Sequence, residues 1–160
     1  MKNMLAFFAF ALLAGAAHSQ DAATRQKHFL LEDNHVAIQG YDPVSYFQSG
    51  QKEGSKSISY AYKGVTYYFA NEANKNIFIA NPDKYEPAWG GWCGHAMALR
   101  GEKVDIDPET YKIVNGRNVL FYKSFWANAL TNWNKEKTPE SELMKMANKF
   151  WSGIVGGSAK

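Results

Sequence analysis

Apolar and polar residues alternate along two parts of this chain, and each part predicts a β-hairpin. The first alternation covers residues 58–62 and resumes over 65–69, with Lys-Gly at 63–64 between them. The second covers 111–122 and is interrupted by Asn-Gly at 115–116. Asn-Gly is typical of the tight turn that joins two antiparallel strands. We therefore expect two hairpins, one in each half of the chain.

Capping residues and helix stops predict helices between and after these hairpins. Asn71 is placed to cap a helix that Asn-Pro at 81–82 ends. Ser124 can cap a helix over about 125–134, and Thr-Pro-Glu at 138–140 begins a last helix. The residues expected on the apolar side of that last helix are Leu143, Met146, Ala147 and Phe150.

The N-terminal part of the domain is expected to be extended and then to turn. We expect a short strand near 35–38, followed by a helical turn over 43–47 with Asp42 as its N-cap. Strands come in hairpins, and no strand–helix–strand alternation demands a parallel sheet. The fold class that follows is α+β, with a small antiparallel sheet of hairpins and flanking helices.

The first residues have the pattern of a secretory signal peptide. Lys2 precedes an apolar run of about 14 residues, shorter than the roughly 20 that span a bilayer. Ala17 and Ser19 are small, as a signal peptidase requires, so we predict a signal at 1–19. The mature protein is then periplasmic or secreted, without stable membrane insertion.

The rest of the chain divides into one domain with short ends. With 160 residues in all, one domain is the default. We expect a flexible lead-in at 20–28, a domain over 29–152 and a loose tail at 153–160. Hydrophobic residues make up 46% of the sequence and charged residues 21%, which is enough to build a core. The net charge of +3 is mild and the basic residues are scattered, so we expect no nucleic-acid partner.

Candidate chemistry gathers at residues 89–97, which hold the only cysteine of the chain, Cys93, together with His95 and Met97. On a strand these three side chains share a face, and thiolate, imidazole and thioether suit copper first and zinc second. On a helix, Cys93 and Met97 share a face and His95 points elsewhere. Either way, the predicted cofactor is a soft or borderline metal ion bound through Cys93.

Two other roles for this region stay open at this stage. Cys93 can act as a redox thiol, and without a second cysteine it would need an external partner thiol. Alternatively, Cys93 is a buried structural residue, and Tyr41, Trp89 and Trp92 line an aromatic cleft for a small ligand or a protein.

Four segments together resemble the YHS-domain family of small secreted bacterial proteins, and the resemblance extends from about residue 29 to about 152. They are 40–47, 67–85, 89–97 and 103–122. The resemblance implies an α+β domain related to the small TRASH-type metal-binding modules. It covers Cys93, whereas the family more often has an aromatic residue at the position of His95. We therefore expect a binding module for a metal ion or a small ligand, rather than an enzyme.

Overall fold

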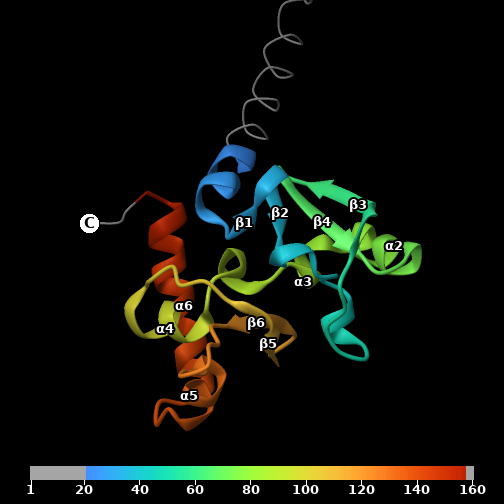
Figure 1. Cartoon of the computed structure of the whole chain (residues 1–160). Coiled ribbons are helices and arrows are strands. Elements are labelled where there is room, and N and C mark those ends of the chain that lie inside the picture. Colours follow the sequence, from blue (N-terminus) through green and yellow to red (C-terminus); the bar gives the residue numbers. More distant parts are fainter. Residues whose placement is uncertain (1–20, 158–160) are drawn as a thin grey trace, which may run out of the picture.

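The computed structural model describes residues 21–157. The predicted signal peptide at 1–19 and residues 158–160 of the predicted tail lie outside this range. Helices and two separate sheets make up the described part (Figure 1), which confirms the α+β class. Within residues 21–157, no helix combines the length and the apolar character that a bilayer crossing demands.

The larger sheet joins the first hairpin to two short N-terminal strands. Its strand order is β1-β2-β4-β3. The strands are β1 (Leu31–Glu32), β2 (Val36–Ala37), β3 (Ser55–Tyr62) and β4 (Val65–Phe69). β1–β2 and β3–β4 are antiparallel, but β2 runs parallel to β4 at Val36 and Thr66. The sheet is therefore mixed, because the chain between β2 and β4 is long enough for a crossover connection.

Both predicted hairpins are confirmed. The second consists of β5 (Asp107–Val114) and β6 (Arg117–Phe121), which form the smaller sheet. Lys63 and Gly64 have φ of 45° and 79°, and Asn115 and Gly116 have φ of 49° and 75°. A two-residue turn with positive φ at both positions matches the twist of the strands that it joins.

The helices that follow the first hairpin are α2 (Glu72–Ala80), α3 (Pro82–Tyr85), α4 (Gly94–Arg100), α5 (Ala129–Lys135) and α6 (Glu140–Val155). Of these, α2, α5 and α6 correspond to predicted helices, α4 is one of the two conformations left open, and α3 was not expected. Asn71 caps α2 as predicted, since its side chain accepts a hydrogen bond from the Asn74 N–H at 2.8 Å. Pro82 ends α2 and also begins α3, because proline is well suited to the first turn of a helix.

The helix predicted over 125–134 begins later than expected. Ser124 Oγ accepts hydrogen bonds from the N–H groups of Trp126 and Ala127, at 3.3 and 3.2 Å, and so closes a tight turn. Asn128 is the N-cap of α5, where its side chain accepts from the Thr131 N–H at 3.1 Å. A serine hydroxyl can accept hydrogen bonds from the backbone of a turn as well as from the start of a helix. At Ser124 it closes a turn.

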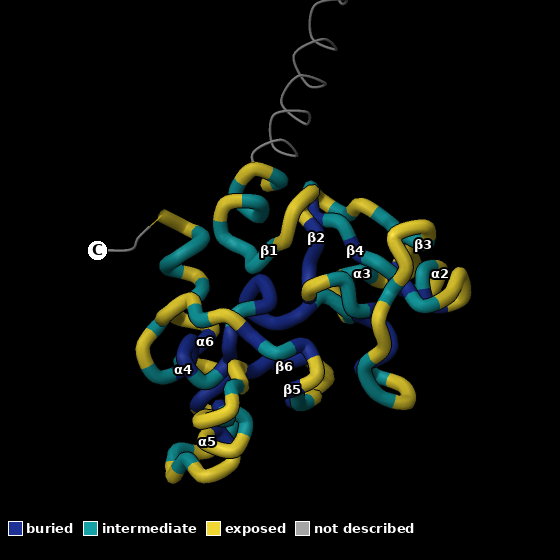
Figure 2. Tube along the Cα trace, in the orientation of Figure 1, coloured by how far each residue is buried: buried dark blue, intermediate teal, exposed yellow. Residues whose placement is uncertain are grey.

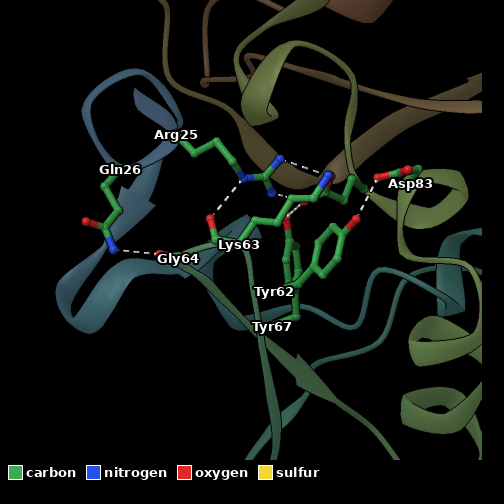
Figure 3. Close-up of polar contacts among 8 residues, drawn as sticks. Arg25, Gln26, Tyr62, Lys63, Gly64, Tyr67 and Asp83 are labelled. Carbon is green, nitrogen blue, oxygen red and sulfur yellow. Dashed lines mark hydrogen bonds and ion pairs between the residues drawn. The ribbon is translucent and has the colours of Figure 1, made fainter. Parts of the chain in front are cut away.

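Residues 21–28 form a helix, where we expected a flexible lead-in. The helix is held against the first hairpin (Figure 3), since Gln26 Nε2 donates to the Gly64 carbonyl at 2.8 Å. Arg25 donates to the Lys63 carbonyl at 3.1 Å and forms an ion pair with Glu86. These contacts join residues far apart in sequence, so the polar composition of the segment gave no sign of them.

The buried core residues come mainly from β4, β6, α4 and α6, and large parts of the tube through these elements are coloured as buried (Figure 2). Leu143 and Ala147 of α6 face it as predicted. Met144 is buried as well, whereas Phe150 is 40% exposed, so the apolar stripe is displaced from the predicted one. α6 also continues to Val155, into the segment expected to be a loose tail.

Candidate functional site

A short turn at Ala88–Gly91 brings the chain to Cys93. Trp89, Gly90 and Gly91 have φ of 50°, 64° and 90°, in the left-handed region that favours glycine. A Cβ atom at Gly90 would lie 2.8 Å from the ring of Phe29. Both the backbone conformation and the tight packing therefore require glycine at this position.

Cys93 is the N-cap residue of α4 and is 1% exposed. Its N–H donates to the Val104 carbonyl at 3.0 Å, and its carbonyl accepts from the Met97 N–H at 3.0 Å. Gly94, the next residue, is packed so closely that a Cβ there would lie 2.4 Å from Val119 Cγ1. The backbone around the thiol is thus fixed on both sides.

The structure decides between the two conformations considered for residues 92–97, because Gly94–Arg100 is a helix and not a strand. Cys93 and Met97 are therefore one helical turn apart and share a face, while His95 points elsewhere. Met97 is completely buried, so its thioether lies in the core. Cys93, His95 and Met97 alternate in the sequence, but their side chains do not all lie on one face of the helix.

His95 lies near the surface and is held by an acidic residue from another element. Its Nε2 is 2.8 Å from Glu136 Oε1, and its side chain is 14% exposed. A carboxylate on one ring nitrogen fixes the tautomer and the orientation of the ring. The atom that remains available to a ligand is therefore Nδ1.

A small pocket of about 210 Å³ lies beside Cys93. It is lined by Cys93, His95, Ala96, Arg100, Val104, Tyr122, Ala127, Ala129 and Asn132. Cys93 and His95 thus line the same hollow, although their side chains point to different sides of α4. Arg100 brings a positive charge, and its Nε donates to Glu102 at 2.6 Å, which offsets that charge.

The pocket offers few metal donors. Among the residues that the structure describes, no group of three or more histidine, cysteine, aspartate or glutamate side chains could hold a metal ion. The donor set available at the pocket is therefore the Cys93 thiol with the His95 ring. Such a pair suits an ion that accepts few, soft ligands better than one that demands four.

The three aromatic residues predicted to line a cleft have different surroundings. Tyr41 lines a hollow on the larger sheet with Glu53 and Tyr68, and its hydroxyl donates to Glu109 at 3.2 Å. Trp89 is 1% exposed and donates to Asn148 at 2.9 Å. Trp92 donates to the His28 carbonyl at 2.7 Å. The structure gives these rings packing and anchoring roles and does not join them in one cleft.

Asp42 is a buried cap, as the sequence predicts. Its Oδ1 accepts from the N–H groups of Val44 and Ser45 at 2.8 and 3.3 Å. Its Oδ2 accepts from the Ala70 N–H at 2.9 Å and from Asn74 Nδ2 at 2.6 Å. All of this bonding ties the turn to the end of β4 and to α2, so Asp42 holds the fold together.

Sequence reasoning missed a partly buried ion pair at Glu86. The Glu86 carboxylate accepts hydrogen bonds from Arg25 and Tyr67, which are both labelled in Figure 3. Burial raises the pKa of Tyr67 well above its ordinary value, and the negative charge of Glu86 adds to this. Burial lowers the pKa of Arg25, but the hydrogen bond and charge of Glu86 outweigh it, so that pKa is raised. Tyr67 therefore stays protonated and donates, and Arg25 stays charged.

Fold and site together define a small α+β domain with a single cysteine beside a narrow pocket. Residues 44–89 match the family model of the YHS domain. The match covers less than a third of the chain, and it supports the resemblance to the YHS-domain family seen in the sequence. The match ends at Trp89, before Cys93, so the wider bounds of 29–152 stay a prediction. Neither a curated protein nor a solved structure matches the chain.

Proposed function

We propose that this protein binds a soft or borderline metal ion, copper first and zinc second, through Cys93. The observation that carries the proposal is that Cys93 and His95 line the same pocket of about 210 Å³. The YHS match supports it at the level of class, because this domain is associated with metal binding.

The donor chemistry favours copper over zinc. Structural zinc is held by four ligands in a tetrahedron, whereas Cu(I) is selected by soft sulfur ligands. Cys93 with His95 supplies two donors, and Glu136 orients the histidine through a 2.8 Å contact. Met97 shares the face of Cys93 but is completely buried, so it contributes only to an ion that sits deeper than the pocket.

The proposal includes a place outside the cytosol. It rests on the secretory pattern of residues 1–19, which was read from the sequence alone. In a periplasmic or secreted setting the natural role of such a module is to hold or pass on copper.

The test is an anaerobic titration of the mature chain with Cu(I) against a competing chelator. We expect one Cu(I) per chain, lost in Cys93→Ser and weakened about tenfold or more in His95→Gln and in Glu136→Gln, since orienting partners of metal ligands have effects of that size. Met97→Leu keeps the core filled and is expected to weaken binding least.

The matched control is His35→Asn, because His35 is an exposed histidine with φ of 60°, a conformation that asparagine tolerates. It should bind like the unaltered chain. Equal binding by Cys93→Ser, or no binding by the unaltered chain, contradicts the proposal.

A second candidate is a redox role for Cys93, because this single free thiol lines the same pocket. In that role alkylation of Cys93 in the folded protein is fast at neutral pH and does not wait for unfolding. Labelling that proceeds only as fast as the protein unfolds would contradict both candidates and leave Cys93 a core residue.

A further inference from the structure

The loop before α5 presents two aromatic side chains almost entirely to solvent. Phe125 and Trp126 are each 90% exposed, while the next most exposed large apolar residue among those described, Ile79, is 41% exposed. Their rings contact each other edge to face, with centroids 4.6 Å apart and planes at 81°. Exposed large aromatic residues on an otherwise folded surface usually mark a place of contact with something else.

The loop that carries these rings is a built turn and not a frayed segment. Ser124 N–H donates to the Ala127 carbonyl at 2.8 Å, and Ser124 Oγ accepts from the N–H groups of Trp126 and Ala127. Lys123 and Asn128 form an antiparallel bridge across its base. The turn therefore holds the rings of Phe125 and Trp126 out at a fixed place, which we call the aromatic tip.

Basic residues lie at the base of the aromatic tip and around the hollows next to it. Lys123 stands at its base, and its Nζ is 3.8 Å from Asp107. The hollow beside Ala127 shares His95 and Asn132 with a second hollow that Lys135 and Lys137 line. Within residues 21–157 neither of these two lysines forms an ion pair, and Glu136 between them bonds to His95. The three lysines near the aromatic tip and its neighbouring hollows therefore outnumber the two acids there, Asp107 and Glu136.

We infer that the aromatic tip docks this protein on an anionic lipid surface, with Phe125 and Trp126 in the interfacial region and the lysines near the headgroups. Aromatic rings, tryptophan above all, favour the boundary between hydrocarbon and water. Each nearby lysine adds attraction to anionic lipids. Both rings protrude with 90% of their surface exposed, and a protruding pair suits a deformable bilayer better than a flat protein surface.

The tip also sits at the end of the molecule remote from the helix at 21–28, because it leads directly into α5 (Figure 1). Ala127 and Ala129, on the C-terminal side of the tip, line the Cys93 pocket. Docking therefore brings that pocket close to the lipid surface. Lipid docking does not depend on metal binding, so either proposal can fail while the other holds.

The test is co-sedimentation of the mature chain with phosphatidylcholine vesicles, with and without phosphatidylglycerol. We expect reversible binding that needs the anionic lipid, falls about tenfold or more in the double variant Phe125→Ala with Trp126→Ala, and falls less in Lys135→Gln with Lys137→Gln. Brominated lipids should quench the fluorescence of the unaltered chain, and this quenching should be lost in Trp126→Phe.

The matched control is Ile77→Ala with Ile79→Ala, two half-exposed apolar residues of α2 at 38% and 41%. It should bind vesicles like the unaltered chain. Equal binding by the tip variant and the control, or no binding to anionic vesicles, overturns the inference. Self-association in sedimentation velocity that is lost in the tip variant, without vesicle binding, overturns it too, and makes the tip a contact between copies of this chain.

Discussion

At the scale of single residues, the packing around Cys93 depends on the neighbouring glycine, Gly94, because its lack of a side chain leaves room for other residues. Gly94 begins α4, and helix propensity alone predicts that alanine there would stabilise the protein. The structure predicts that alanine would instead destabilise the protein, because a Cβ at this position would lie 2.4 Å from Val119 Cγ1 and 3.0 Å from the Trp89 ring. Core packing thus outweighs local preference at the residue next to the thiol.

Gly94→Ala is therefore expected to lower the free energy of unfolding by about 1–3 kcal/mol, the usual cost of overpacking a core. Urea denaturation of the two proteins measures this. The double variant Gly94→Ala with Val119→Ala removes the clashing methyl groups and should be more stable than the sum of the two single effects. Strict additivity would show that the two positions do not clash.

At the scale of elements, Glu140 connects three of them. It lies in the first turn of α6 and accepts hydrogen bonds from Trp133 Nε1 of α5, at 2.8 Å, and from Lys112 of β5. Burial raises the pKa of Glu140, but the hydrogen bonds from Lys112 and Trp133 and the charge of Lys112 outweigh it. The net effect holds the pKa below its ordinary value of 4.5.

A lowered carboxyl pKa means that ionised Glu140 stabilises the fold at neutral pH. As pH falls below about 4.5, the unfolded chain takes up the proton first, and the stabilisation is lost as pH passes through the folded pKa. Glu140→Gln should therefore cost up to about 1 kcal/mol at neutral pH, since the side chain is 38% exposed, and progressively less under acid conditions. Urea denaturation at a series of pH values measures this.

Glu142→Gln is the matched control for Glu140, since it lies in the same helix and forms one exposed ion pair, with Lys145 at 3.3 Å. Its effect should stay within about 0.5 kcal/mol at every pH. A cost for Glu140→Gln that does not change with pH would contradict the electrostatic account.

At the scale of the whole molecule, the helix at 21–28 is attached through the partly buried ion pair between Arg25 and Glu86, whose side chains are each 12% exposed. Arg25 also lies over the ring of Phe29, at 4.5 Å from its centroid. Arg25 therefore both neutralises a carboxylate buried beneath it and packs the helix onto the domain.

Arg25→Met should lower the free energy of unfolding by about 3 kcal/mol, because it leaves Glu86 buried without its cation. Adding Glu86→Gln removes that charge and keeps an acceptor for the Tyr67 hydroxyl, so the double variant should recover part of the loss. Urea denaturation measures both, and hydrogen exchange at 21–28 reports whether the helix detaches. A double variant less stable than Arg25→Met would contradict this account.

Local chemistry made a good part of the fold predictable. The Lys63-Gly64 and Asn115-Gly116 turns, the Asn71 cap and the Asp42 cap all depend on residues within a few positions of one another. The α+β class followed from the order of these elements, and Cys93 as the centre of the candidate site followed from its being the only cysteine.

What the sequence left undecided depends on residues that meet only after folding. It could not choose between strand and helix for residues 92–97, because the choice rests on packing of Gly94 against Val119 and Trp89. It could not give His95 its partner Glu136, or show that the helix at 21–28 is attached.

The sequence by itself determined the hairpins and most of the caps, since each is set by neighbours along the chain, and it singled out Cys93 as the candidate site residue. Only the tertiary structure decided that Cys93 and His95 line one pocket while Met97 is buried in the core. It also decided that Phe125 and Trp126 stand exposed instead of lying in a helix face. Burial and pocket shape are properties of surfaces that come together from distant segments, and local patterns carry no record of them.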